Sequence, residues 1–207
     1  MTARKPVGAL IFALLPALMI FGPVGTATAP VAPTTQVRPM AAATAPAVCR
    51  APARRGFWPL QANVARVGKY VPVIPVGRTH GVPNSPPLTS SGKRSFGWDQ
   101  RGPAPGSRYG NVRFNAHTYP DGSALGNRLL ARLVVGSRII VRGANGVGIC
   151  YRVTKRISVT PRSYAARVGY YNTTGKPKLA IVVCSGKRLG PGNWTRRTIW
   201  YAKPSIS

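Results

Sequence analysis

Short runs of β-branched and aromatic residues, each ended by glycine, proline or asparagine, follow one another from about residue 57 onward. Runs of this length and composition are typical of β-strands. They predict strands at residues 70–76, 111–116, 137–142, 147–159, 178–183 and 198–202. The dipeptide Asn145-Gly146 between two of these runs predicts a hairpin turn, because both residues tolerate the backbone conformation that such a turn requires.

Helices are few in this pattern. One is predicted at residues 123–133, with Ser123 as its N-cap. Four leucines recur there at helical spacing: Leu125, Leu129, Leu130 and Leu133. A shorter helical turn is predicted after Pro161. Many short strands with one or two short helices predict a mainly β fold, a compact barrel rather than a parallel sheet with crossover helices.

The N-terminus has the pattern of an export signal. Arg4 and Lys5 precede an apolar stretch at residues 7–21, and the small-residue segment after it ends in Ala27-Thr28-Ala29. The apolar stretch up to residue 24 is also close to the length of a short membrane span, so a retained anchor is the alternative. Either alternative places the rest of the chain outside the cytoplasm.

Three segments are therefore predicted. Residues 1–29 form a signal peptide or an N-terminal membrane anchor. Residues 30–56 are rich in Ala, Pro and Thr without a helical or strand period, which indicates an extended linker. Residues 57–207 form the folded domain.

The charge balance excludes several kinds of chemistry. The chain has 30 Lys and Arg residues against two acids, Asp99 and Asp121, which gives a net charge of +28. Glycoside hydrolysis by paired carboxylates needs two acids beside one bond, and carboxylate-rich Ca²⁺ or Mg²⁺ sites need more acids than this chain has. A chain of this charge attracts polyanions. The cations are scattered, however, and export argues against a nucleic-acid partner.

Three cysteines are present, an odd number in an exported protein, so at least one thiol stays unpaired within the monomer. Cys184 directly follows the apolar run 179–183 and is predicted to lie at a strand end, where a rigid sheet can hold a nucleophile. A buried structural cysteine is the alternative. Cys150 fits that alternative better, because it lies inside an apolar run; Cys49 lies in the linker and could pair with Cys150 as a disulfide.

A nucleophilic thiol needs a neighbouring group that accepts and returns its proton. His117 follows the predicted strand 111–116 at once, whereas His80 lies in a Gly/Pro/Ser-rich segment and is predicted to be a loop residue. Arg197 heads the last predicted strand, and a hairpin joining that strand to residues 179–183 would bring it back beside Cys184. A guanidinium there could stabilise an oxyanion. Strand alternation favours Arg197 over its neighbour Arg196 for this role.

The order and spacing of these residues resemble the sortases, the cysteine transpeptidases of Gram-positive surfaces. The matching stretches are residues 114–117 (FNAH), 180–184 (AIVVC) and 194–200 (WTRRTIW). In the family the Cys motif is T-L-x-T-C, so Ala180 and Val183 stand in place of its two threonines. The resemblance covers roughly residues 71–202, and in texture it is closest to the actinobacterial class E and F subgroups.

The resemblance implies a closed β-barrel of about eight strands with His117, Cys184 and Arg197 as catalytic residues. It implies cleavage of a C-terminal sorting motif of exported proteins through a thioester, and transfer to an amine of a peptidoglycan precursor or a pilin. It implies no cofactor and no metal, a monomer at the extracellular face of the membrane, and an N-terminal membrane attachment if the leader is uncleaved. The alternatives are another cell-wall cysteine peptidase or transpeptidase, and a non-enzymatic cationic wall-binding protein.

Overall fold

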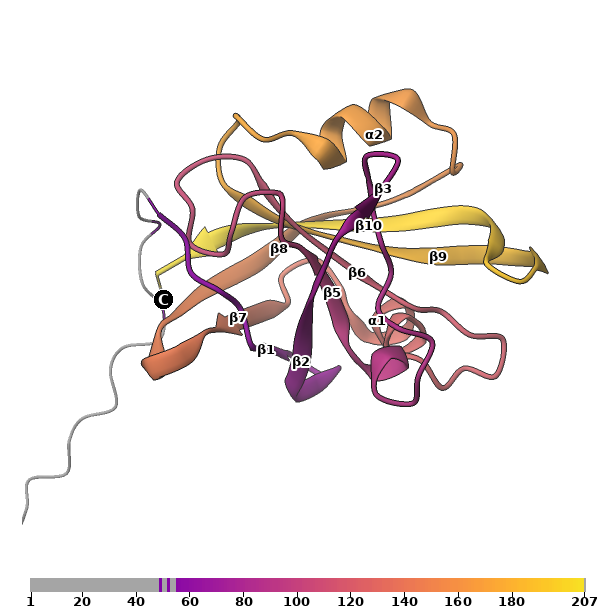
Figure 1. The fold of residues 1–207 in the computed structure, drawn as a ribbon, viewed down its shortest axis with the longest axis horizontal. Helices are drawn as coiled ribbons and strands as arrows, with labels where there is room; N and C mark the ends of the chain where they lie inside the picture. Colours follow the sequence, from indigo (N-terminus) through magenta and orange to yellow (C-terminus); the bar gives the residue numbers. More distant parts are fainter. Residues whose placement is uncertain (1–48, 50–51, 53–54, 207) are drawn as a thin grey trace, which may run out of the picture. The chain divides into compact units, whose positions relative to one another are not determined.

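The computed structural model describes Cys49, Pro52 and residues 55–206, which belong to one unit spanning residues 44–207 (Figure 1). The predicted signal peptide or anchor lies outside the described residues, as does nearly all of the predicted linker. No helix in the described part of the chain is long and apolar enough to cross a membrane.

Eight strands close into a barrel in the order β1-β2-β5-β6-β9-β10-β8-β7. They are β1 (Gln61–Val64), β2 (Gly68–Val76), β5 (Phe96–Asp99), β6 (Asn111–Ala116), β7 (Arg138–Arg142), β8 (Gly148–Val159), β9 (Lys178–Gly190) and β10 (Asn193–Ser205). The pairs β2–β5 and β6–β9 are parallel and the others are antiparallel. Two short strands, β3 (Arg78–Thr79) and β4 (Val82–Pro83), form a separate hairpin. The predicted mainly β barrel of about eight strands is confirmed.

Alternating side chains of the strands fill the barrel. Phe96, Phe114, Ile181 and Trp200 come from four different strands, and each is at most 1% exposed. Burial of side chains of this size stabilises a fold by about 1.5–3 kcal/mol each, so the interior supplies the main stabilising term. Trp200 also donates from its indole nitrogen to the carbonyl of Leu133, at 3.0 Å, so this buried donor is paired.

Two α-helices lie outside the barrel, α1 (Leu125–Arg132) and α2 (Tyr164–Tyr171). Leu125, Leu129 and Leu133 are fully buried, as the leucine spacing predicts. The predicted N-cap is wrong: the cap position is Ala124, and the Ser123 hydroxyl instead bonds to Asp121 at 2.6 Å. A turn that Asp121 builds with the Ser123 backbone and side chain competes with capping.

Helix α2 covers the outer faces of β9 and β10 (Figure 1). Tyr170 of α2 packs against Ala180 and Ile199 in a second, smaller apolar cluster. Asn111 at the start of β6 fixes the end of the helix, because its amide nitrogen donates to the carbonyls of Gly169 and Tyr170, at 2.7 and 3.2 Å. The barrel wall formed by β6, β9 and β10 is therefore apolar inside and partly covered outside.

Asp99, the last residue of β5, is buried and bonds to two arginines. Its carboxylate accepts from Arg78 at 2.9 and 2.8 Å and from Arg113 at 2.7 Å, and Asp99 and Arg113 are each 1% exposed. Burial opposes ionisation of Asp99, but the hydrogen bonds and charges of the two guanidinium groups outweigh it and hold the pKa of the carboxyl below its usual range. One of the chain's two acids is therefore buried and already paired with two arginines.

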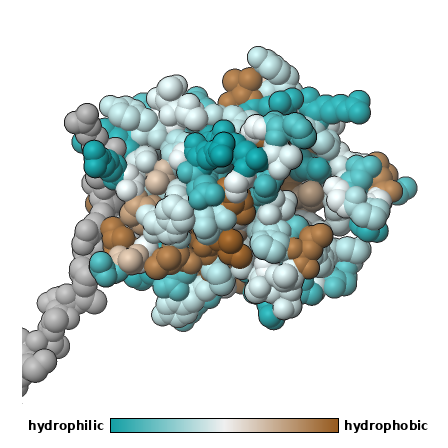
Figure 2. All heavy atoms as spheres, in the orientation of Figure 1, coloured by the Kyte–Doolittle hydropathy of each residue, from teal (hydrophilic) through white to brown (hydrophobic). Residues whose placement is uncertain are grey.

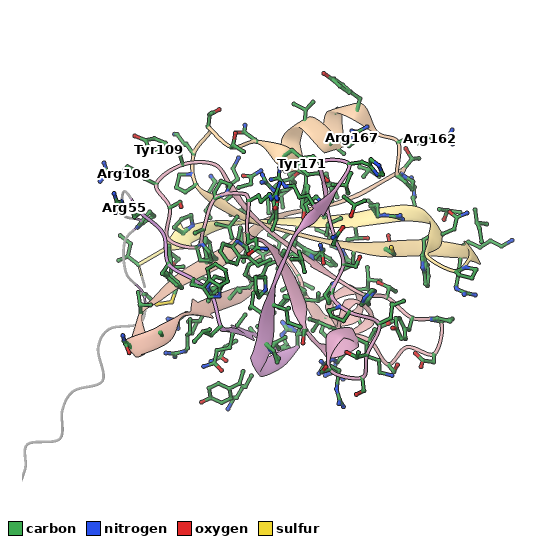
Figure 3. The ribbon with its side chains drawn as sticks, in the orientation of Figure 1. Arg55, Arg108, Tyr109, Arg162, Arg167 and Tyr171 are labelled. Carbon is green, nitrogen blue, oxygen red and sulfur yellow. A yellow bond between two sulfur atoms is a disulfide. The ribbon has the colours of Figure 1, made fainter. Side chains whose placement is uncertain are left out.

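The remaining cations are spread over the surface. Figure 2 shows hydrophilic side chains over most of the viewed face, with apolar side chains gathered mainly at its lower left and centre. Arg162 and Arg167 lie by α2, whereas Arg55 and Arg108 lie at the other side of the view, and all four are exposed (Figure 3). With Asp121 as the only acid outside the core, surface ion pairs cannot neutralise this charge.

Cys49 and Cys150 form a disulfide, and their Cα atoms are 4.8 Å apart. Cys150 is fully buried in β8, so the bond fixes the segment before the domain to the barrel wall. The two cysteines are 101 residues apart in sequence. A crosslink that closes a loop of this length restricts the unfolded chain strongly.

We expect Cys49→Ser to lower the free energy of unfolding by about 3–5 kcal/mol, because the loop-entropy effect of closing about 100 residues is lost. Denaturant unfolding, with and without a reducing agent, measures the change. Cys184→Ala serves as the matched control, and its stability should respond to reductant as that of the wild type does. A non-reducing peptide map should show Cys49 linked to Cys150. A Cys150–Cys184 link in that map would contradict the pairing.

Candidate active site

Cys184 lies on the outer face of β9. Leu179, Ile181 and Val183 point into the barrel core, and Ala180 and Val182 belong to the outer cluster under α2. Because side chains alternate along a strand, Cys184 falls on the outer face. Its thiol is free and half-buried.

The ladder between β9 and β10 places Arg197 directly opposite Cys184. Residues opposed in an antiparallel pair have Cα atoms about 4.5–5.5 Å apart and side chains on one face. Ile199 and Tyr201 of β10 lie in the outer cluster as well, which agrees with this placement of Arg197. Arg196 is opposite Ser185 and belongs to the other face of the sheet.

His117 completes the arrangement from β6. The parallel ladder between β6 and β9 ends with Ala116 opposite Val183, so His117 comes next to Cys184 in the same register. Ala116 points into the core, and alternation therefore turns His117 to the outer face. Three residues that are far apart in sequence, His117, Cys184 and Arg197, are brought together on one face of three neighbouring strands.

The predicted strand ends are only partly correct. β6 ends at Ala116, directly before His117, as expected. Cys184, however, lies within β9, which continues to Gly190, and Arg197 lies within β10, which begins at Asn193. The polar residues after Cys184 pair with β10 as a long hairpin, as in the pair Arg188–Trp194. Backbone pairing therefore holds both residues more firmly than strand ends would.

His117 is held by its surroundings on two sides. Its Nε2 lies 2.7 Å from the carbonyl oxygen of Pro86, and because a carbonyl only accepts, Nε2 carries the hydrogen. Its own carbonyl accepts from the backbone nitrogen of Gly126 in α1, at 2.7 Å. A Cβ at Gly126 would collide with that carbonyl, so glycine is required for this close approach. Nδ1 is the ring atom that can exchange a proton without breaking the bond to Pro86.

Thr118 connects the two strands that carry His117 and Cys184. Its hydroxyl donates to the carbonyl of Cys184 at 2.8 Å. This bond lies just past the pair Ala116–Val183, the last pair of the ladder between β6 and β9. Nearby, the Asn115 side chain donates to the carbonyl of Asn84 at 2.9 Å and so fixes the loop that carries Pro86. Thr118 and this loop were not predicted from sequence; the only signal for Thr118 is its position directly after His117.

Two opposing effects act on the Cys184 thiol. Burial raises its pKa, and the positive charge of Arg197 partly opposes that rise; the net pKa is above the ordinary value. The thiol is therefore mainly protonated at neutral pH, and a proton acceptor is needed for nucleophilic attack. The Arg197 guanidinium donates from Nη1 to the carbonyls of Trp194 and Arg196, at 3.2 and 3.0 Å.

This balance predicts the pH dependence of thiol alkylation. The rate of reaction of Cys184 with iodoacetamide should rise with pH and reach its midpoint above the roughly 8.5 of an unperturbed cysteine, because only the thiolate reacts. In Arg197→Ala the midpoint should move further up, since the charge that favours the thiolate is removed. Mass spectrometry of the alkylated peptide gives the rates. A midpoint below about pH 8 in the wild type would contradict the assigned environment.

Other candidates lie elsewhere. His80 is exposed in the turn between β3 and β4, as its loop prediction requires. Among the described residues, no group of three or more His, Cys, Asp or Glu side chains could hold a metal ion. The site thus consists of a thiol, an imidazole and a guanidinium, groups suited to acyl transfer.

No family model and no curated protein sequence matches the chain. Solved structures do match. Sortase C1 of Streptococcus agalactiae, in complex with MTSET, superposes with a TM-score of 0.52 and 15% identity, over 72% of this chain and 70% of that one. The chain has the sortase fold. Sortase C of Streptococcus pneumoniae gives a TM-score of 0.52 at 10% identity over 72% and 69% of the two chains. Sortase C1 of Streptococcus suis gives 0.52 at 13% identity over 72% and 73%.

The sortase fold confirms the resemblance read from the sequence at the level of architecture. The three matched structures are class C sortases by name, so the class E and F subgroup stays a prediction. The sortase barrel also explains the departures from the Cys motif in physical terms. Val183 lies in the barrel core, 2% exposed, so its missing hydroxyl changes the interior rather than the face that carries Cys184. Ala180 lies beneath α2 in the outer cluster.

Proposed function

We propose that the protein is a cysteine transpeptidase of the sortase type, with Cys184 as nucleophile. The observation that carries the proposal is the register of three strands. In the ladder between β9 and β10, Arg197 lies opposite Cys184. In the ladder between β6 and β9, Ala116 lies opposite Val183, and His117 is the residue after Ala116. A nucleophile, a proton carrier and a fixed cation on one face are the groups that a thioester mechanism needs.

The reaction proceeds in two acyl transfers. His117 takes the proton of the Cys184 thiol as the sulfur forms a bond to a backbone carbonyl carbon of the substrate, and the carbonyl electron pair moves onto oxygen. Arg197 stabilises that oxyanion. When this tetrahedral intermediate breaks down, the carbon–nitrogen bond is cleaved, and the leaving amine takes a proton from His117. An amine of a second substrate then attacks the thioester, gives up a proton, and releases the thiol.

This chemistry and the likeness to sortases support a choice of substrates. The acyl donor is an exported protein with a C-terminal sorting motif, and the acceptor is an amine of a peptidoglycan precursor or of a pilin. Both occur at the cell surface, where the pattern of residues 1–29 would bring the domain, as a signal peptide or as a membrane anchor. The enzyme acts as a monomer and uses no cofactor and no nucleic acid.

A peptidyl probe with a thiol-reactive group in place of the scissile amide tests the proposal. Mass spectrometry after incubation should find the probe on Cys184 alone, and denatured protein should react far more slowly because the aligned groups are lost. Modification at an equal rate in native and denatured protein would show ordinary thiol reactivity and would refute the proposal.

A further inference from the structure

A second polar site lies at one end of the barrel, on the side of β9 and β10 away from Cys184. The inner face of β9 is apolar through Val183 and then becomes polar at Ser185. The inner face of β10 changes in the same way, from Trp200 to Thr198 and Arg196. The apolar interior therefore ends in polar and cationic side chains.

These residues line an open pocket of about 560 Å³. Arg156 and Arg196 supply two guanidinium groups, and Ser158, Ser185 and Thr198 supply three hydroxyls. The ladder of β8 with β10 brings Ser158 opposite Thr198. Three neighbouring strands thus contribute hydrogen-bond donors to one concave surface.

Within the described part of the chain, no carboxylate neutralises this pocket. The chain has two acids; Asp99 is bound to Arg78 and Arg113 in the barrel wall, and Asp121 is bound to Ser123. The two pocket arginines therefore have no acidic partner. Close cations without a counter-charge favour the binding of an anion.

Arg156 is held in place before any ligand binds. Its Nη2 donates to the carbonyl of Leu130 at 3.1 Å, and its guanidinium carbon lies 5.2 Å from the centre of the Trp200 ring. These contacts occupy one N–H and one face of the guanidinium, so further N–H groups remain for a ligand. Less conformational entropy is lost when a fixed side chain binds.

The side chains that β9 and β10 contribute to the pocket are also positioned before a ligand binds. A Cβ at Gly186 would come within 2.8 Å of the Arg196 Cγ, so the absence of a side chain there gives room to the Arg196 stem. The Thr198 hydroxyl donates to the Ser185 oxygen at 2.9 Å, and both residues are buried. Ser185 then keeps its own hydroxyl proton for donation into the pocket.

We propose that this pocket binds a phosphate-class oxyanion, a phosphate or diphosphate group. Two planar guanidinium groups and additional hydroxyl donors suit a tetrahedral, multiply charged anion, which accepts hydrogen bonds on several sides. The group could belong to a free anion or to a lipid headgroup. The pocket is separated from Cys184 by the sheet, so the proposal does not depend on the acyl-transfer function.

The test compares two charge-matched double variants of the full chain. Arg156→Gln/Arg196→Gln removes the pocket cations, and Arg162→Gln/Arg188→Gln removes two exposed cations outside it. Inorganic pyrophosphate is titrated by calorimetry at fixed, low salt. The pocket variant should bind at least about tenfold more weakly than the wild type, and the control within about twofold, because charge-assisted hydrogen bonds are lost only in the first.

Equal losses in the two variants, or no loss in either, would overturn the proposal, since binding would then follow net charge alone. Thermal melting checks that both variants fold. A second arm uses vesicles of phosphatidylglycerol. If the pocket variant also loses vesicle binding beyond the control, the bound group is presented by a headgroup; if both variants lose it equally, the ligand is a free anion. Alkylation of Cys184 should be unchanged in the pocket variant, which separates this site from the thiol.

Discussion

Cys184→Ala should abolish thioester formation completely and leave the barrel folded. The substitution removes the nucleophile itself, so no residual acylation is expected by this route. The side chain is half-buried and makes no disulfide, so its loss should change the free energy of unfolding by no more than about 1 kcal/mol. Intact-protein mass spectrometry with an activated peptide ester or a sorting-motif peptide measures the acyl-enzyme.

Cys49→Ser is the matched control for this change. It removes another sulfur, but from the disulfide, and it should keep the acyl-enzyme under conditions in which the domain stays folded. Retention of the acyl-enzyme in Cys184→Ala would show that another group reacts. Loss of acylation only in Cys150→Ala would show that the chemistry belongs to a different thiol.

Arg197 should respond to substitution more strongly than any other surface cation. We expect Arg197→Ala to lower turnover by about a hundredfold or more, because loss of one well-placed oxyanion donor typically costs about 10²–10³ in rate. Arg197→Lys should lower it by at least about tenfold, since an ammonium cannot keep the bonds to the Trp194 and Arg196 carbonyls and also present a planar fork to substrate. Steady-state rates with a peptide substrate measure both.

The neighbouring Arg196 supplies the control. It is exposed, lies opposite Ser185 and belongs to the other face of the sheet, so Arg196→Lys should have little effect on turnover. If Arg196→Ala were the damaging change and Arg197→Ala the mild one, the register read for β10 would not describe the reacting enzyme. If substitution of neither arginine changed turnover, the result would argue against the sortase mechanism as a whole.

The strands that build the candidate site could be predicted because local sequence determines them. Residues 111–116 were predicted from composition alone and coincide with β6. Strand alternation predicted that Arg197, rather than Arg196, lies on the same face of the sheet as Cys184, and the ladder between β9 and β10 agrees with this. β6 is almost entirely buried, and in a buried strand the local pattern and the tertiary packing favour the same structure.

Other elements were missed because distant residues stabilise them. β5 contains a glycine and Asp99, an unfavourable composition for a buried strand, and it is completed by arginines 21 and 14 residues away in sequence. The end of β9 and the start of β10 carry few apolar residues, so no strand was predicted at residues 184–197; their mutual pairing makes them strands. The Pro86 carbonyl beside His117 comes from a segment without any periodic signal.

The disulfide determines how a pulling force would pass through the domain. A force applied to the chain before Cys49 enters the barrel at Cys150 in β8 and does not peel away β1, because residues 50–149 are bypassed. β8 pairs along its length with β10, and β10 pairs with β9 at Cys184. Tension between a substrate acylated on Cys184 and the N-terminal segment would therefore act along two adjacent ladders in shear. In that geometry many hydrogen bonds resist together, so the domain should withstand more force with the disulfide intact than after its reduction.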